Sequence, residues 1–171
     1  MDEPLLDEMA RRGIAWAPLL GIALPMWETA VRYGETERVA WIESSMDALH
    51  RFLPEAERRG VRLLTGTDWH PQVTVAHEMR ELHAFGVPRA AALAAATWGA
   101  RAFLGEPGIA DGAPADLLVL RRDPREDLGV FDAPAAISIG GVPVEPDLRQ
   151  LQRPRIGWDA ACRSDRSALT N

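Results

Sequence analysis

The amino-acid sequence predicts an α/β fold with a parallel sheet, followed by a small all-β element. Short apolar runs bounded by turn residues occur at 14–19 and 61–67 and are typical of buried strands. Helical periodicity lies between and after these runs, and strands that alternate with helices indicate parallel pairing through right-handed crossovers. After Leu104 the periodicity stops, and turn clusters separate short strand-like runs.

The helices follow from apolar residues at spacings of three and four, and we expect them over 2–12, 36–59, 74–85 and 88–104. Pro54 would kink the second of these helices, which could therefore be two. The segment 20–34 contains Gly, Pro and scattered apolar residues and is expected to be a long loop or a broken helix.

The β element is expected to contain strands at 115–121, 135–139 and 142–144, with a hairpin turn at Gly140-Gly141. Apolar periodicity fades after Glu145, and 147–171 is expected to be irregular or disordered. The domain boundaries that follow are 1–105 for the strand–helix part, 106–146 for the β element and 147–171 for the tail.

Composition excludes several classes of function. The net charge of −6 makes nucleic acid an improbable partner, and no apolar run is long enough to cross a membrane. All 19 basic residues are arginine, so the chain offers no lysine for a Schiff base, a general base or a carbamylated metal bridge. A single cysteine, Cys162, excludes a disulfide framework within one chain. The N-terminus does not resemble a signal peptide, and we expect a cytoplasmic protein.

Asp68 is the leading candidate for chemistry, because it follows the apolar run 61–67 directly. From the residues alone, it is either a metal ligand or a strand-end residue that caps the following turn. Trp69 and His70 come next and could contact a substrate, although the residues alone favour a loop histidine without a role. His77 lies opposite the apolar stripe of its helix, so we expect it either at the mouth of a cleft, where it could contact a substrate, or in water. Glu78, in the first helical turn, needs only a structural interpretation.

Four motifs occur in the order and spacing of a known family. Thr65-Gly66-Thr67-Asp68 followed by His77-Glu78-Met79-Arg80-Glu81-Leu82 resembles the last barrel strand of the amidohydrolase superfamily. The resemblance is greatest to the branch of imidazolonepropionase and the metal-dependent dipeptidases. The segment 86–97 resembles the next helix of that family, and 108–120 resembles its return to a β-sandwich. The match covers residues 1–145.

The resemblance implies the C-terminal part of a (β/α)₈ barrel with a small β-sandwich segment. It also implies a site for Zn²⁺ or another divalent metal at the carboxyl ends of the strands. In such enzymes, metal-activated water attacks a carbon–nitrogen bond of a small-molecule substrate. Asp68 matches the aspartate that binds the metal and carries the proton. Trp69 and His70 depart from the family pattern, which has a small residue after this aspartate.

The other ligands of the family are missing from this sequence. It contains no His-x-His pair and no lysine. We therefore expect the chain to be the C-terminal portion of such an enzyme, paired with a complementary N-terminal half or forming a homo-oligomer. The alternative is a non-catalytic remnant or assembly module.

Overall fold

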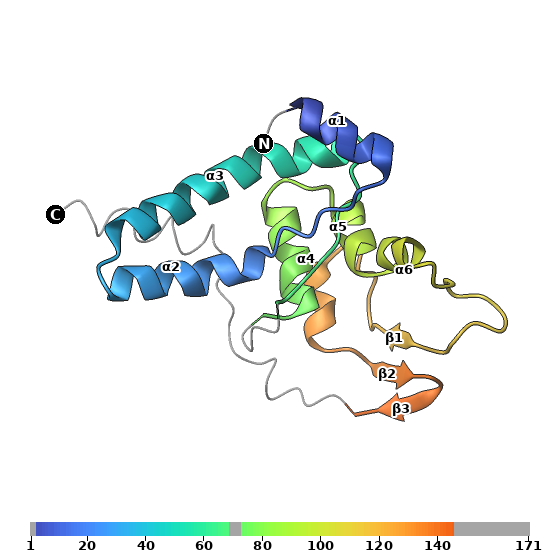
Figure 1. Cartoon of the computed structure of the whole chain (residues 1–171). Helices are drawn as coiled ribbons and strands as arrows, with labels where there is room; N and C mark the ends of the chain where they lie inside the picture. Colours follow the sequence, from blue (N-terminus) through green and yellow to red (C-terminus); the bar gives the residue numbers. More distant parts are fainter. Residues whose placement is uncertain (1–2, 69–72, 146–171) are drawn as a thin grey trace.

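The computed structural model describes residues 3–68 and 73–145 (Figure 1). The predicted tail 147–171 and the candidate residues Trp69 and His70 lie outside these ranges. The described elements are α1 (Glu3–Arg12), η1 (Leu20–Ile22), α2 (Ala23–Arg32), α3 (Thr36–Arg58), α4 (Val75–Ala84), α5 (Arg89–Ala96), α6 (Trp98–Leu104), β1 (Leu117–Val119), η2 (Leu128–Asp132), β2 (Ala136–Ile139) and β3 (Val142–Val144).

The two predicted parallel strands meet in a single parallel bridge between Trp16 and Leu63. The Trp16 N–H donates to the Arg62 carbonyl at 2.8 Å, and the Leu64 N–H donates to the Trp16 carbonyl at 2.9 Å. The pairing direction is confirmed, but full strands over 14–19 and 61–67 are not formed. The next donor in the ladder would be residue 18, and Pro18 has no N–H. On the other side, the Ile14 N–H is already donated to the Met9 carbonyl.

The expectation of a loop or broken helix over 20–34 was wrong for most of the segment. The short helix η1 leads directly into α2, which packs alongside α3 as a helical hairpin (Figure 1). Pro25 does not break α2, because it is the third residue of the helix, where the N–H has no intrahelical partner. Trp27 joins the two helices, with its indole N–H donating to Glu43 Oε1 at 3.0 Å.

Two helix boundaries differ from expectation in opposite directions. The helix α3 continues through Pro54 without dividing. The helix predicted over 88–104 is divided at Thr97, whose backbone leaves the helical region at φ −130° and ψ −114°. The Thr97 hydroxyl donates to the Leu93 carbonyl at 2.6 Å, and such bonds compete with the regular helical ladder. The result is two short helices, α5 and α6.

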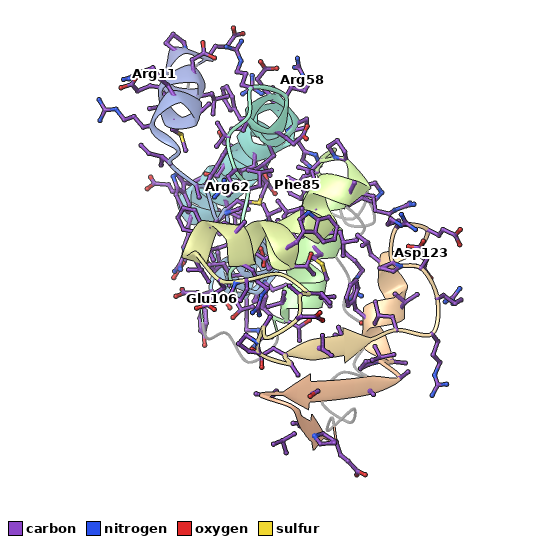
Figure 2. All side chains as sticks on the ribbon, turned by 90° about the vertical axis from the view of Figure 1, so that its right-hand side faces the viewer. Arg11, Arg58, Arg62, Phe85, Glu106 and Asp123 are labelled. Atoms are coloured by element: carbon purple, nitrogen blue, oxygen red, sulfur yellow. The ribbon has the colours of Figure 1, made fainter. Side chains whose placement is uncertain are left out.

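The β element is a three-stranded antiparallel sheet in the order β1-β2-β3. The three predicted strands are confirmed, although β1 is shorter than expected. Ile139 pairs with Val142 across the Gly140-Gly141 turn. The Asp116 carboxylate holds that turn by accepting the Gly140 N–H at 2.7 Å. Figure 2 shows the sheet at the opposite end of the molecule from Arg11 and Arg58.

The main core lies where α1, α2, α3 and α4 surround the parallel bridge. Its largest fully buried side chains are Phe85, Leu6, Leu20, Ile42, Leu53 and Leu82. A smaller cluster of Met79, Leu93 and Leu128 joins α4 to α5 and η2. The helix α4 is therefore covered on more than one side. Over residues 3–68 and 73–145, no helix is long and apolar enough to cross a membrane.

Gly86 ends α4 with φ +88°, and Gly60 ends α3 with φ +83°. A Cβ at Gly86 would lie 3.0 Å from Pro54 Cγ, whereas a Cβ at Gly60 would meet nothing within 4 Å. Both Gly→Ala changes should lower the free energy of unfolding by about 1 kcal/mol for the left-handed backbone alone. Gly86→Ala should cost roughly 1 kcal/mol more because Pro54 must move. Urea denaturation of both variants measures the difference, and equal losses would contradict the Pro54 contact.

Candidate functional site at the ends of the parallel pair

Asp68 is exposed and stands at the end of the segment that carries the parallel bridge. Its backbone is left-handed, with φ +47°. Leu19, at the end of the partner segment, is also left-handed, with φ +56°. These are the only non-glycine residues with positive φ in the described part of the chain. Such conformations cost free energy and are found most often at functional sites. The ends of the two segments are therefore the candidate functional site.

The most densely connected polar group near these strand ends is the carboxylate of Glu78. The helix α4 begins after Thr74, whose hydroxyl oxygen accepts the His77 N–H at 3.2 Å. Glu78 therefore lies in the first turn, and its side chain is 0% exposed. Its Oε2 accepts the Leu20 N–H at 3.0 Å, and its Oε1 accepts the Gly21 N–H in a short hydrogen bond.

The shape of residues 19–21 explains why two successive N–H groups point at one carboxylate. A left-handed residue followed by right-handed ones turns neighbouring N–H groups toward the same side, which makes a concave anion-binding nest. Here the anion is part of the same chain. The carboxylate thus connects α4, which follows the second strand, to the segment that follows the first.

Gly21 has no space for a side chain. A Cβ at this position would lie 2.6 Å from Glu78 Oε1, 2.6 Å from Val73 Cγ1 and 2.7 Å from His77 Cδ2. The backbone of residues 20–21 therefore fits closely against the start of α4 and the residue that precedes it. Val73 is also the first described residue after Asp68.

Burial raises the pKa of Glu78 to about 7. The hydrogen bonds from Gly21 and Leu20 act in the opposite direction, and the nearby Glu81 carboxylate adds to the rise. The free-energy cost of removing the ionised carboxylate from water is larger than the stabilisation that two neutral N–H donors give it. Glu78 is therefore a group whose charge changes near neutral pH inside the protein.

The structure corrects the expected position of His77. Its side chain is 7% exposed, so it lies neither at an open cleft mouth nor in water. The reason is that η1, α5 and η2 all pack on α4, which leaves little of the helix facing solvent. His50, on α3, stacks on Phe85 with ring centroids 3.8 Å apart.

The described residues do not form a complete metal site. No group of three or more His, Cys, Asp or Glu side chains among them is arranged to hold a metal ion. Zinc in proteins is usually held by four ligands, or by three and a water. Asp68 could supply one such ligand and the rest must lie elsewhere, so no catalytic step through a metal follows from these residues alone.

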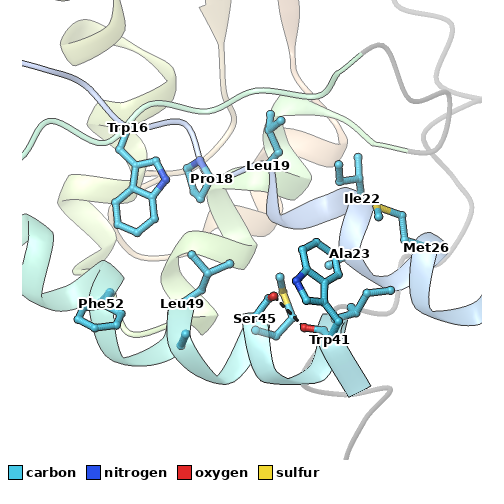
Figure 3. Close-up of a pocket in the computed structure, with 13 residues that line it drawn as sticks. Trp16, Pro18, Leu19, Ile22, Ala23, Met26, Trp41, Ser45, Leu49 and Phe52 are labelled. Atoms are coloured by element: carbon cyan, nitrogen blue, oxygen red, sulfur yellow. Dashed lines mark hydrogen bonds between the residues drawn. The ribbon is translucent and has the colours of Figure 1, made fainter. Parts of the chain in front are cut away.

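A separate apolar groove of about 430 Å³ lies between α2, α3 and the first strand segment (Figure 3). Trp16, Trp41 and Phe52 contribute aromatic surface to it. Trp16 therefore both forms the parallel bridge with Leu63 and lines this groove. The Ser45 hydroxyl is already donated to the Trp41 carbonyl at 2.8 Å. The groove therefore offers apolar surface and little hydrogen-bonding chemistry.

Sequence reasoning missed the role of Glu78. The signal was present, because Glu78 lies three residues before Glu81 and four before Leu82, on the side of α4 that also carries Phe85. These side chains are all buried, so a carboxylate stands within the apolar stripe. A charge in that position predicts a buried partner, but not which one. The partner lies 57 and 58 residues earlier in the chain, which no local pattern reveals.

Comparisons with known proteins show that the fold of this chain resembles part of two solved structures. No family model matches this chain. Uncharacterized proteins of Mycobacterium tuberculosis and Mycobacterium bovis are 38% identical over 89 residues, which is 50% of this chain and 24% of theirs. Among solved structures, an uncharacterized protein has a TM-score of 0.68 at 25% identity, over 86% of this chain and 39% of its own. A. niger ochratoxinase has a TM-score of 0.66 at 23% identity, over 93% and 37%.

These relatives are considerably longer than this chain, which spans about a quarter of the curated ones and under two fifths of the solved ones. The likeness nevertheless extends over most of residues 1–171. The helix–strand order and the small antiparallel sheet therefore form a recurrent arrangement and not an isolated one. The chain has the fold of part of a larger α/β protein, similar to the corresponding part of ochratoxinase.

The raised pKa of Glu78 predicts how stability depends on pH. Between about pH 4.5 and about pH 7 the folded chain binds this proton and the unfolded chain does not. Stability should therefore fall as pH rises through this window and level off above it. The Glu78 contribution should decrease by roughly 2 to 3 kcal/mol.

Denaturant unfolding of wild type and Glu78→Gln at about pH 5 and about pH 8 measures this effect, since Gln cannot titrate. The difference between the two proteins should change by that amount. A difference that stays constant with pH would show that Glu78 is ionised in both states.

Proposed function

We propose that this chain provides the last strands of a (β/α)₈ hydrolase of the amidohydrolase superfamily, acting on carbon–nitrogen bonds of non-peptide or dipeptide-like substrates. Asp68 is its catalytic carboxylate and metal ligand. The observation that carries the proposal is the position of Asp68. It is exposed and left-handed, and it directly follows the second of two segments that pair in parallel.

Strand direction supports this position. In α/β folds, ligands bind beyond the carboxyl ends of parallel strands, and in (β/α)₈ barrels the catalytic residues stand there. Both non-glycine left-handed residues of the described chain, Leu19 and Asp68, stand at such ends. The resemblance of Thr65-Gly66-Thr67-Asp68 to the last barrel strand of the superfamily, and the fold likeness to A. niger ochratoxinase, favour the same assignment.

The active site would be completed by a complementary N-terminal half. A parallel pair needs further strands beside it and cover on both faces. The other ligands for Zn²⁺ or another divalent metal would come from those strands, because the described residues contain no group of three or more His, Cys, Asp or Glu side chains that could hold a metal ion. In that assembly Asp68 would offer its carboxylate oxygens to the metal and could hold a proton between substrate and solvent.

Substrate contacts are proposed for Trp69 and His70, which directly follow Asp68 in the chain. His77 is buried against the position of Gly21, so packing between α4 and η1 is the role we now favour for it. The substrate is proposed to be a small molecule, because the motifs match enzymes that act on small molecules.

A second candidate function is that of a non-catalytic assembly module, and the small sheet favours it. Every described side chain of β1 is apolar and exposed, and Ile139 and Val142 are 62% and 64% exposed. A three-stranded sheet with bare apolar side chains is typical of a surface that another chain, or a second copy, covers. The same surface would also join the sheet to the rest of a β-sandwich.

Removal of Asp68 tests the proposed metal role. Zinc titration by calorimetry should show weak binding to the wild-type chain, and binding at least tenfold weaker to Asp68→Ala. Asp111→Ala removes another exposed loop carboxylate and serves as the matched control, which should bind zinc as wild type does. Equal binding by the wild type and Asp68→Ala would show that Asp68 has no metal function of its own.

Loss of apolar surface from the small sheet tests the assembly role. Size-exclusion chromatography with light scattering should show self-association of the wild-type chain that increases with concentration. Val142→Glu places a charge on the exposed face of β3 and should shift the protein toward monomer. Val31→Glu, at a 40% exposed position of α2, controls for charge alone. A wild type that stays monomeric at all concentrations would contradict an assembly role for this surface.

A further inference from the structure

We infer that Glu78 is a positioning residue for Asp68. Its carboxylate holds residues 19–21 in their left-handed turn, and the Leu19 side chain then holds the backbone of Gly66, two residues before Asp68. The inference rests on the role proposed for Asp68, and it assigns a function to the one carboxylate that sequence analysis treated as structural.

The first step runs from α4 to the segment after the first strand. Glu78 is fully buried, and each of its carboxylate oxygens accepts one of two successive backbone N–H groups. Leu20 and Gly21 are themselves buried, so water cannot replace the carboxylate as acceptor. Without it, two buried donors would be unsatisfied, at a cost of about 1 to 3 kcal/mol each. The left-handed Leu19 therefore depends on Glu78 for its shape.

The second step runs from Leu19 to the strand that leads to Asp68. A Cβ on Gly66 would lie 2.6 Å from Leu19 Cδ2, so the Leu19 methyl group rests directly on the Gly66 backbone. Ala17 Cβ approaches the same position at 3.8 Å. Glycine at 66 is required for this contact. A change in the Leu19 turn would therefore move residues 66–68 or leave them without support.

Val73, the first described residue after Asp68, is contacted by the same turn. Gly21 packs against Val73 and His77, at the beginning of α4. Leu19 contacts Gly66 before Asp68, and Gly21 contacts Val73 after it. Glu78 accepts the N–H groups of Leu20 and Gly21 in that turn. One buried carboxylate therefore holds the turn that contacts both Gly66 and Val73.

The surroundings of Glu78 make its charge a usable readout. Glu81 is the charged neighbour that raises its pKa, and His77 lies beside it against Gly21. The residues of η1 carry no titratable side chain. From η2, Asp132 is paired with Arg80 at 2.9 Å. From α5, the Arg89 guanidinium donates to the Arg125 carbonyl. Loss of the Glu78 proton should change the chemical shift of each backbone amide that the carboxylate holds in place, directly or through Leu19.

Nuclear magnetic resonance titration of the ¹⁵N-labelled chain, from about pH 5 to about pH 9, tests the inference. In the wild type, the amide signals of Leu20, Gly21, Gly66 and Thr67 should share one midpoint near pH 7. In Glu78→Gln this shared midpoint should disappear. A transition caused by His77 would instead persist in that variant, which separates the two groups.

Leu19→Ala keeps the two hydrogen bonds to Glu78 and removes the contact with Gly66. Leu20 and Gly21 should still titrate in this variant, and Gly66 and Thr67 should not. Glu43→Gln neutralises the carboxylate that accepts the Trp27 indole N–H, in a contact between other elements, and should behave as wild type does. If Glu78→Gln does not fold, the wild type and Leu19→Ala decide the question. Gly66 and Thr67 signals that do not titrate in the wild type, or titrate unchanged in Leu19→Ala, would overturn the inference.

Zinc binding separates this inference from the proposed function. If Asp68 binds the metal, Glu78→Gln should bind zinc about tenfold more weakly than wild type, as residues that orient a ligand do. Glu78→Asp keeps the charge on a shorter side chain and should recover part of the loss. If the wild type and Asp68→Ala bind zinc equally, the proposed function fails, while the titration still decides whether Glu78 controls residues 66–67.

Discussion

The buried carboxylate of Glu78 is the interaction on which the rest of the site depends. It lies among apolar side chains, and burial there is costly for a charge. The compensation is two backbone N–H groups from Leu20 and Gly21, which the left-handed Leu19 turns toward it. Each part requires the other, because the donors need an acceptor and the carboxylate needs donors. The ends of the two parallel segments are held together in this way.

The parallel pair is weak in itself, and its surroundings compensate for that weakness. One bridge joins Trp16 to Leu63, since Pro18 interrupts the ladder on one side and Ile14 is engaged by α1 on the other. Beyond the bridge, the Thr65 N–H is donated to the Ala95 carbonyl at the end of α5. The strand that leads to Asp68 is therefore supported by helices where a sheet neighbour is absent.

The two ends of the molecule differ in how their apolar side chains are covered. Around the parallel bridge, side chains from α1 to α5 form a continuous apolar core. At the other end, the small sheet leaves apolar side chains such as Ile139 and Val142 exposed. Similar solved chains are more than twice as long as the part this chain matches. The exposed strands are accordingly the surface where additional chain would contribute most hydrophobic free energy.

The sequence by itself determined most of the local structure. Apolar spacing located α1, α3 and α4, the Gly140-Gly141 pair located the hairpin, and the alternation of elements indicated the parallel direction of Trp16 and Leu63. The helices and the hairpin depend on residues close together in the sequence, which local patterns report. The parallel direction followed from the order of strands and helices along the chain. Sequence patterns did not determine three other features: the extent of α2, the continuity of α3 through Pro54 and the break at Thr97.

Only the tertiary structure decided the roles of the site residues. Asp68 was identified from its place after a strand, but its left-handed backbone was not. His77 and Glu78 were both assigned to solvent or to the helix dipole, and both are buried because three separate elements cover α4. Glu78 meets its donors across more than fifty residues of chain. These hydrogen bonds form only when the chain packs, because their partners are distant in sequence. No local sequence pattern therefore predicts them.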